Sequence, residues 1–412
     1  MIVLTTNTED EMPDNLVSAA TRERTIHVPD LDRGRWTSVA TLGIGTFAIG
    51  TDMFVVAGVL SGLATDLGVA IGEAALTVTV FALAYGIGAT LLSALLGARP
   101  LRQVLIGSLL LVGLFNVLSA LAPTLPVLLA ARALGALAAS VYVPAAGAAA
   151  VAAVPPSHRG RALGVLLGGS SIAMVLGAPL GVLLAAMLSW RAAFGLVAVL
   201  AAVTVLGLLL SSVGSNPLTH STVRERLRPV RSPAVVGTLG VTFLVMTASN
   251  TMYTHLGGLL GAAAGPIGLG LFIAAFGLGG VLGTWWGGTA ADLRGGCRGV
   301  LLAVIGLAVS FAVLPLVAET VGAALIVVVG WGIAAWGFVP AQQHRLIGLR
   351  SGPAPLLLAL NSSAIHLGFA AGALLGGLVV DAAGVSSLWM LAVACCGAGL
   401  ILHEILTREG QP

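Results

Sequence analysis

Two ionisable side chains of opposite sign, Asp52 and Arg132, lie well inside apolar runs of the sequence. A carboxylate near the middle of a membrane-spanning helix costs ~3 kcal/mol, so it usually faces a water-filled cavity or a partner charge. At the rise of an α-helix, Asp52 lies about 18 Å and Arg132 about 10 Å from the same side of the membrane. The two side chains can therefore pair, directly or through water, and such a carboxylate can bind and release a proton or a cation. Alternatively, Arg132 could snorkel to the nearer interface.

Polar and aromatic side chains recur at helical spacing in the apolar runs and could line a cavity around this pair. In one run Tyr142 falls on the face of Arg132, and in another Asn250 and Thr254 share a face with Tyr253 beside them. The candidates for the cavity are Tyr85, Asn116, Tyr142, Asn250, Tyr253, Thr254, Phe338, Asn361 and His366. Any one of them could instead be a packed or hydrogen-bonded residue between helices. The histidine could titrate near physiological pH, but the buried acid is the stronger candidate for coupling because it carries a formal charge.

The composition requires a membrane-embedded chain. Of the 412 residues, 58% are apolar and only 8% are charged, where a soluble domain carries about a quarter charged residues. The apolar runs exceed twenty residues and lack strand-like alternation, so the predicted fold class is an all-α polytopic membrane protein. The net charge of +3 is scattered over short links, which argues against a nucleic-acid-binding face. The three cysteines form no metal-ligand or disulfide pattern, so we expect no metal site.

Twelve apolar runs are long enough to cross a bilayer, which takes ~20 residues. They are 37–64, 73–96, 102–122, 125–153, 162–188, 191–213, 234–262, 267–290, 299–318, 321–344, 355–380 and 386–406. The longest internal link is polar and arginine-rich and divides the runs into two sets of six. The predicted organisation is a disordered cytoplasmic tail at 1–35, a six-helix bundle at 36–213, a cytoplasmic linker at 214–233, a second six-helix bundle at 234–406 and a cytoplasmic tail at 407–412.

The arginines predict the orientation of these spans. There is no lysine, and seventeen of the 19 basic residues fall in links on the N-terminal side of the membrane, against Arg191 alone on the other side. This bias places both termini in the cytoplasm. The all-arginine, alanine- and glycine-rich composition is typical of a GC-rich bacterial genome, so we expect a bacterial cytoplasmic membrane.

An internal repeat relates the two sets of spans. Val143-Pro144-Ala145 matches Val339-Pro340-Ala341 at an offset of 196 residues, and the same offset takes Arg102 to Arg298 and Gly181 to Gly377. These matches fall at equivalent places in the topology, which favours two parallel six-helix halves. The offset places the neutral Ala248 opposite Asp52, so the buried acid belongs to one half only.

These motifs together resemble the major facilitator superfamily, nearest its twelve-span drug:proton antiporters of the chloramphenicol-resistance and arabinose-efflux-like branch. The resemblance covers about 37 to 406. The first-helix pattern of the branch resembles Gly50-Thr51-Asp52-Met53-Phe54, its helix-four motif is similar to the segment Arg132–Gly135, and its Tyr-Thr pair resembles Tyr253-Thr254. The resemblance implies two pseudo-symmetric six-helix bundles, and it implies that Asp52 and Arg132 couple transport to protons.

Other segments resemble the gating elements of that family. Gly177-Ala-Pro179-Leu-Gly181 is similar to the antiporter motif, in which small residues allow close helix packing and proline bends the helix. Alternatively, these glycines serve helix packing alone. The loop after each half's second span resembles the family's cytoplasmic loop, which implies a charge latch formed by Asp292, Arg294 and Arg298 in the second half and by Arg99 and Arg102 in the first. Alternatively, Asp292 caps a helix end or serves the topology alone. The first-half loop departs from the family pattern, because the 196-residue offset sets Leu96 where the acid would stand.

We therefore expect a transporter and not an enzyme, with no cofactor and with a proton gradient as the energy source. The chain lacks lysine, so it cannot form a nucleotide-binding loop with the required lysine. We expect small amphipathic drugs as substrates, the lipid bilayer and protons as the other partners, no nucleic acid, and a monomer. A sugar or metabolite exporter with the same machinery is the alternative, which Gln342, Gln343, Trp331 and Trp336 keep open.

Overall fold

The computed structural model describes residues 29–96, 99–155, 158–211, 228–352 and 354–409. The side chains of some further residues within its helices, Asp292 and Arg294 among them, are outside the description. In the described part of the chain every regular element is helical, and the prediction of an all-α membrane protein is confirmed. Eleven helices are long and apolar enough to cross a membrane, and a bent pair makes a twelfth span, as the sequence predicts.

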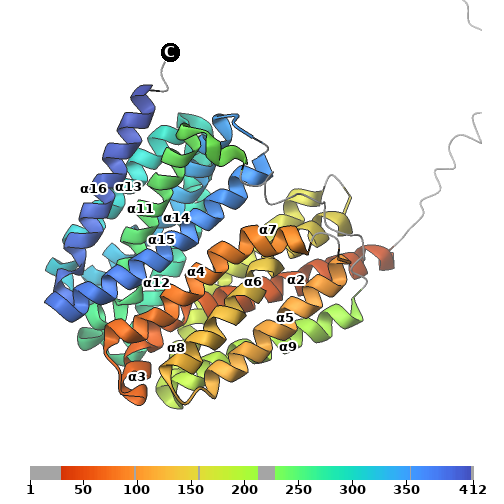
Figure 1. Cartoon of the computed structure of the whole chain (residues 1–412), viewed down its shortest axis with the longest axis horizontal. Coiled ribbons are helices and arrows are strands. Elements are labelled where there is room, and N and C mark those ends of the chain that lie inside the picture. The colour runs from red at the N-terminus through yellow and green to blue at the C-terminus, as the bar shows by residue number, and fades with distance from the viewer. Residues whose placement is uncertain (1–28, 97–98, 156–157, 212–227, 353, 410–412) are drawn as a thin grey trace, which may run out of the picture.

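The first half of the chain comprises the helices that precede residue 211. They are α2 (Pro29–Phe54), α3 (Val56–Leu67), α4 (Ile71–Leu95), α5 (Leu101–Ala120), α6 (Leu125–Ala153), α7 (Arg159–Ile172), the π-helical turn η2 (Ala173–Gly177), α8 (Ala178–Met187) and α9 (Trp190–Leu210). The segment α7–η2–α8 forms one span, and α2 with α3 forms the bent one. These helices lie together at the lower right of Figure 1, coloured red to yellow-green.

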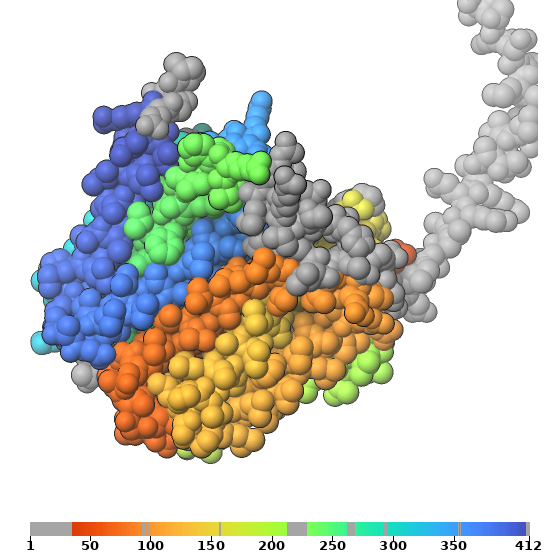
Figure 2. All heavy atoms as spheres, in the orientation of Figure 1, coloured from red at the N-terminus to blue at the C-terminus, as the bar shows by residue number. Residues whose placement is uncertain are grey.

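The second half begins after a short 3-10 turn, η3 (Arg228–Arg231). It contains α11 (Pro233–Thr254), α12 (Leu256–Arg294), α13 (Gly296–Val317), α14 (Val321–Gly348), α15 (Ala354–Ala383), the 3-10 turn η4 (Val385–Ser387) and α16 (Leu388–Glu409). Figure 1 shows these green and blue helices packed beside the first half, with α15 and α4 side by side. Figure 2 shows the atoms of the two segments in contact along that seam.

Two boundaries differ from the prediction. Residues 29–35, expected in the disordered tail, form the first turns of α2. The link expected at 262–267 is also wrong, because α12 runs through it as helix and the chain breaks earlier, at His255. Gly265 and Pro266 in this stretch predict a break, but α12 continues through both residues.

A break between helices falls at corresponding places in the two halves. Helix α2 ends at Phe54 and α3 begins at Val56, and α11 ends at Thr254 and α12 begins at Leu256. These breaks are 200 residues apart, not 196, so the residue equivalent to Asp52 is Met252 at this offset. The repeat therefore contains a shift between the first and fourth spans of each half, and Asp52 still has a neutral counterpart.

The two halves close against each other from mid-depth to the end where α3 meets α4, which we call the Asp66 end. The opposite end, where α2 begins and α9 ends, is the arginine-rich end. Between α4 and α15, Gly72 N donates to Asp381 Oδ1 at 3.3 Å and Ser363 Oγ donates to Gly86 O at 2.9 Å. On the other side of the seam, a Cβ added at Gly277 of α12 would lie 2.6 Å from the carbonyl carbon of Met174.

Candidate functional site

The site is built on the break in the first span. The segments α2 and α3 meet at an angle of 49°, and Gly58 N donates to Val55 O and not to Phe54 O as a continuous helix would require. The last carbonyls of a helix have no partner within it and must find other donors. The break therefore exposes acceptors on the turn that carries Asp52.

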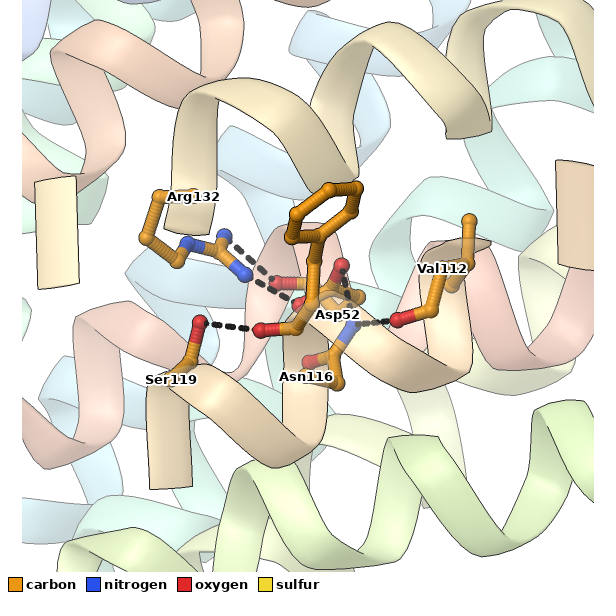
Figure 3. Close-up of polar contacts among 6 residues, drawn as sticks. Asp52, Val112, Asn116, Ser119 and Arg132 are labelled. Carbon is orange, nitrogen blue, oxygen red and sulfur yellow. Dashed lines mark hydrogen bonds and ion pairs between the residues drawn. The ribbon is translucent and has the colours of Figure 1, made fainter. Parts of the chain in front are cut away.

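Arg132 of α6 binds both the side chain and the backbone of Asp52. Its Nη1 forms an ion pair and hydrogen bond with Asp52 Oδ1, and its Nη2 donates to Asp52 O at 3.2 Å. Figure 3 shows the guanidinium facing the carboxylate across the gap between the two helices. The two charges predicted to pair are thus in direct contact, and Arg132 does not extend to the membrane interface.

The pair is fully enclosed by protein. Asp52 is 0% exposed and Arg132 is 2% exposed. The guanidinium carbon lies 4.1 Å from the centroid of the Phe81 ring and 5.2 Å from that of Phe194, which is the geometry of a cation–π contact. Removing one partner of a buried ion pair costs about 3–5 kcal/mol because it leaves an uncompensated charge. The neutral form of Asp52 is therefore a state in which Arg132 must find another partner.

Asn116 of α5 occupies the other oxygen of the carboxylate. Its Nδ2 donates to Asp52 Oδ2 at 3.2 Å and to Val112 O at 3.0 Å (Figure 3). Two buried polar atoms at this site, Asn116 Oδ1 and Arg132 Nε, have no hydrogen-bond partner in the described part of the chain. These atoms leave unused acceptor and donor capacity next to the acid. The sequence predicts that Asn116 lines the cavity, whereas in the structure its side chain donates a hydrogen bond to the acid itself.

The same helix break joins the acid to the second half. Tyr253, in the last turn of α11, donates its hydroxyl to Phe54 O at 3.1 Å, the carbonyl that the break frees. The Phe54 ring lies edge-on to Tyr253 at 5.8 Å and to Trp336 at 6.0 Å between ring centroids. Asp52 is two residues from Phe54, so the turn that carries the acid is in direct contact with both halves.

An aromatic pocket surrounds this contact. Phe54, Tyr253, Phe276, Trp336 and Phe369 line it together with the polar side chains of Ser249 and Asn250. Its free volume is about 10 Å³, so the rings nearly fill it in this conformation. Trp336 Nε1 is buried and has no partner in the described residues. A pocket of ring faces with a few polar groups suits an amphipathic or cationic ligand.

The other cavity candidates are divided between the seam and the interior of each half. Tyr85 stacks on His366 across the seam at 4.1 Å between ring centroids. Asn250 donates to Thr254 Oγ1 at 3.1 Å and to Phe369 O at 2.7 Å, beside the aromatic pocket.

Three further candidates lie in the interior. Tyr142 donates to Leu42 O at 3.0 Å in the core of the first half, and Phe338 is fully buried in the core of the second. Asn361 Oδ1 accepts from Thr242 Oγ1 at 2.8 Å, between α11 and α15. These three side chains do not line the aromatic pocket.

The predicted gating motif packs on the broken helix. A Cβ at Gly177 would lie 2.1 Å from Thr51 Oγ1, and one at Gly181 would lie 2.4 Å from Val55, so both glycines allow contact with the turn around Asp52. Pro179 follows a π-helical turn, which is the local distortion that its missing N–H predicts. The motif therefore contacts the acid-bearing turn on one side and α12 on the other.

The predicted charge latch is only partly described. The side chains of Asp292 and Arg294 lie outside the described residues, and Arg298 is exposed. Arg102 Nη2 donates to Leu208 O and Leu209 O, at 3.3 and 2.9 Å, at the end of α9. Arg99 is exposed and lines a groove at the arginine-rich end. Arg99 and Arg102, the latch residues of the first half, therefore have no interaction partner in common.

Sequence reasoning missed the aromatic part of the site. Phe81 and Phe194, which cover Arg132, and Phe276 and Phe369, which line the pocket, are phenylalanines among many apolar residues. No spacing rule separates them from core residues. One signal in the sequence could have indicated the aromatic pocket: Phe54 follows the buried acid by two residues.

Comparisons with known proteins agree with this architecture. The family model of the Major Facilitator Superfamily matches residues 42–354. The inner membrane transport protein YdhP of Escherichia coli (strain K12) is 31% identical over 378 residues, covering 90% of this chain and 96% of the relative. A chloramphenicol resistance protein of Streptomyces lividans is 30% identical over 341 residues, covering 81% and 86%.

The fold agrees with solved structures at lower sequence identity. A bacterial homologue of the human lysosomal transporter Spinster, solved in an inward-facing and unoccupied conformation, superposes with a TM-score of 0.70 at 15% identity, covering 91% of this chain and 97% of that one. The twelve spans in two halves, the acid in the first span and the family match lead to one conclusion. The chain belongs to the Major Facilitator Superfamily of transporters.

Proposed function

We propose that this transporter exports small amphipathic compounds in exchange for protons, with Asp52 as the proton-binding group. The observation that carries the proposal is the fully buried contact of Asp52 with Arg132 and Asn116 on a broken helix that also contacts the second half. Protonation of the acid removes the charge that holds Arg132. The broken turn can then move relative to α6, and α3 moves with it.

The coupling follows from thermodynamic linkage. A proton weakens the ion pair, and the ion pair holds the turn whose Phe54 ring lines the aromatic pocket. If protonation changes the affinity of that pocket for substrate, substrate changes the affinity of Asp52 for a proton by the same factor. Alternating access then requires only that the proton-bound and the substrate-bound transporter open toward opposite sides of the membrane.

The orientation and location are part of the proposal. The arginine bias puts the arginine-rich end in the cytoplasm of a bacterial cell and the Asp66 end outside. The seam contacts Gly72–Asp381 and Gly86–Ser363 then close the outer side in this conformation. In this conformation, in which the outer side is closed, Asp52 is paired with Arg132. We expect this pairing after the proton has been released to the cytoplasm.

The sugar-exporter alternative has less support in the geometry. Of the polar groups that kept it open, Trp336 Nε1 lines the aromatic pocket without a partner among the described residues, but Trp331 Nε1 donates to Ser249 Oγ at 3.0 Å and Gln342 Nε2 donates to Thr238 O at 2.6 Å inside the second half. Trp331 and Gln342 are both fully buried. A sugar site needs free polar groups facing the ligand, whereas the pocket beside Asp52 is lined mostly by rings.

The experiment begins with expression in an efflux-deficient bacterium and a panel of amphipathic antibiotics and sugar analogues. A compound to which the chain gives resistance is then followed in proteoliposomes under a pH difference. One pH unit corresponds to 1.36 kcal/mol, so exchange of one proton for a neutral compound supports about a tenfold gradient. The Asp52→Asn variant should bring inside and outside concentrations to equality.

Two control variants isolate the role of the acid. Asp52→Glu keeps the charge and should retain a gradient. Asp66→Asn removes an acid of the same span that is 45% exposed and paired with Arg191, and it should leave the gradient unchanged. A pH-driven gradient in well-folded Asp52→Asn protein would refute the coupling role, and resistance to sugar analogues alone would favour the alternative.

A further inference from the structure

A groove of about 560 Å³ opens on the first half between α4, α5 and α6, away from the site around Asp52. Figure 2 shows these helices, orange to gold, on the face turned to the viewer. Leu111 and Leu134, which line the groove, are each 46% exposed, so its wall belongs to the outer surface of the bundle. In a membrane this surface faces lipid.

The groove is polar at one end and apolar at the other. Arg99 and Gln103 line it at the arginine-rich end, and Leu111, Phe115 and Leu134 line it deeper in the membrane. From Gln103 to Phe115 the helical rise is about 18 Å. One leaflet has a hydrocarbon depth of about 15 Å, half of the bilayer core. The groove therefore extends through one leaflet with its polar end at the headgroups.

Arg99 is the group in this groove that can select a headgroup. It is exposed, and its guanidinium makes no hydrogen bond or ion pair with any described residue, whereas its neighbour Arg102 is bound to the end of α9. Among the described residues, the groove contains no acidic side chain that could neutralise it. A free arginine at the interface attracts an anionic headgroup, by about 1 kcal/mol for each basic residue.

We propose that this groove binds an anionic phospholipid of the leaflet at the arginine-rich end, with one acyl chain along α5 and the phosphate at Arg99. Gln103 donates to the same headgroup region, and the walls of Leu111, Phe115 and Leu134 hold the chain. The proposal does not depend on proton coupling, because its readout is lipid binding.

The test uses purified protein in detergent and native mass spectrometry with phosphatidylglycerol or phosphatidylcholine of the same acyl chains. The unmodified chain should retain one phosphatidylglycerol more tightly than phosphatidylcholine. Arg99→Gln should weaken phosphatidylglycerol binding about fivefold and leave phosphatidylcholine unchanged. Equal affinity for the two lipids in the unmodified chain would overturn the assignment of the headgroup.

A glycine in the groove provides the test for the acyl chain. Gly107 lines the groove, and a Cβ there would meet no atom within 4 Å, so Gly107→Leu fills the groove without a backbone clash. Gly195 of α9 has equally open surroundings and lies outside the groove, so Gly195→Leu is the matched control. Gly107→Leu should weaken both lipids several-fold relative to Gly195→Leu. Equal retention by the two leucine variants would overturn the groove, and size-exclusion profiles establish that both fold.

Discussion

Removing one hydroxyl, in Tyr253→Phe, should release the closed Asp66 end. The hydroxyl donates to Phe54 O at 3.1 Å, and both groups are buried in the closed state. Leaving a buried acceptor unsatisfied costs about 1–3 kcal/mol. Once the halves separate there, water can satisfy both groups and the substitution costs little. The closed state should therefore lose about 5- to 150-fold in population relative to the open one.

The structure offers a matched control for this change. Tyr85 also lies in the seam, stacked on His366, but its hydroxyl makes no hydrogen bond within the described residues. Tyr85→Phe therefore removes the same atom from the same seam without freeing an acceptor. It should leave the population of the closed state within about twofold of the unmodified protein.

Cysteine labelling measures the population. Ala57 lies between the halves at the Asp66 end and is 4% exposed. With Cys297, Cys395 and Cys396 replaced by alanine, Ala57→Cys reports opening by its rate of reaction with a maleimide in detergent. Tyr253→Phe should accelerate labelling at least fivefold. Equal rates in the Tyr253→Phe and Tyr85→Phe backgrounds would refute the hydrogen bond as a lock between the halves.

Two further substitutions test the seam and the Asp66 end. Gly277→Ala would place a Cβ 2.6 Å from the backbone of Met174, so the halves must move apart there, and maleimide labelling of the Ala57→Cys reporter should rise. Arg191→Gln removes an ion pair with Asp66 in which the side chains are 34% and 45% exposed; exposed pairs contribute little to stability, so thermal unfolding in detergent should shift by only a few degrees. A large loss of folded protein on Arg191→Gln would contradict this, as would unchanged labelling on Gly277→Ala.

The buried charges could be predicted from sequence because their cost in lipid is large and their depths are countable. Asp52 and Arg132 lie in runs where nothing else is charged, and the pairing in the structure follows from that. The stripe on α6 also predicts that Tyr142 shares the face of Arg132. In the structure both side chains point at α2, to Leu42 O and to Asp52, ten residues apart along α6. Residue spacing predicts which face of a helix a side chain lies on, but it does not predict which residue of the neighbouring helix that side chain contacts.

The break in the first span could not be predicted from sequence, because no local signal marks it. Val55 is flanked by Phe54 and Val56, with no proline or glycine at the break itself. The donors that satisfy its carbonyls, Arg132 and Tyr253, come from 80 and 199 residues away along the chain. Local helix propensity cannot predict a break that is stabilised by hydrogen-bond donors from distant parts of the chain.

The recurrence of the break at His255 shows that this backbone shape does not require a buried charge. Both halves break at the corresponding turn, although only one half carries an acid there. The break is therefore common to both halves, whereas the acid and its ion pair with Arg132 are present in one half only. Met252, which corresponds to Asp52 in the second half, lies three residues before a break that forms without a charged side chain at that position.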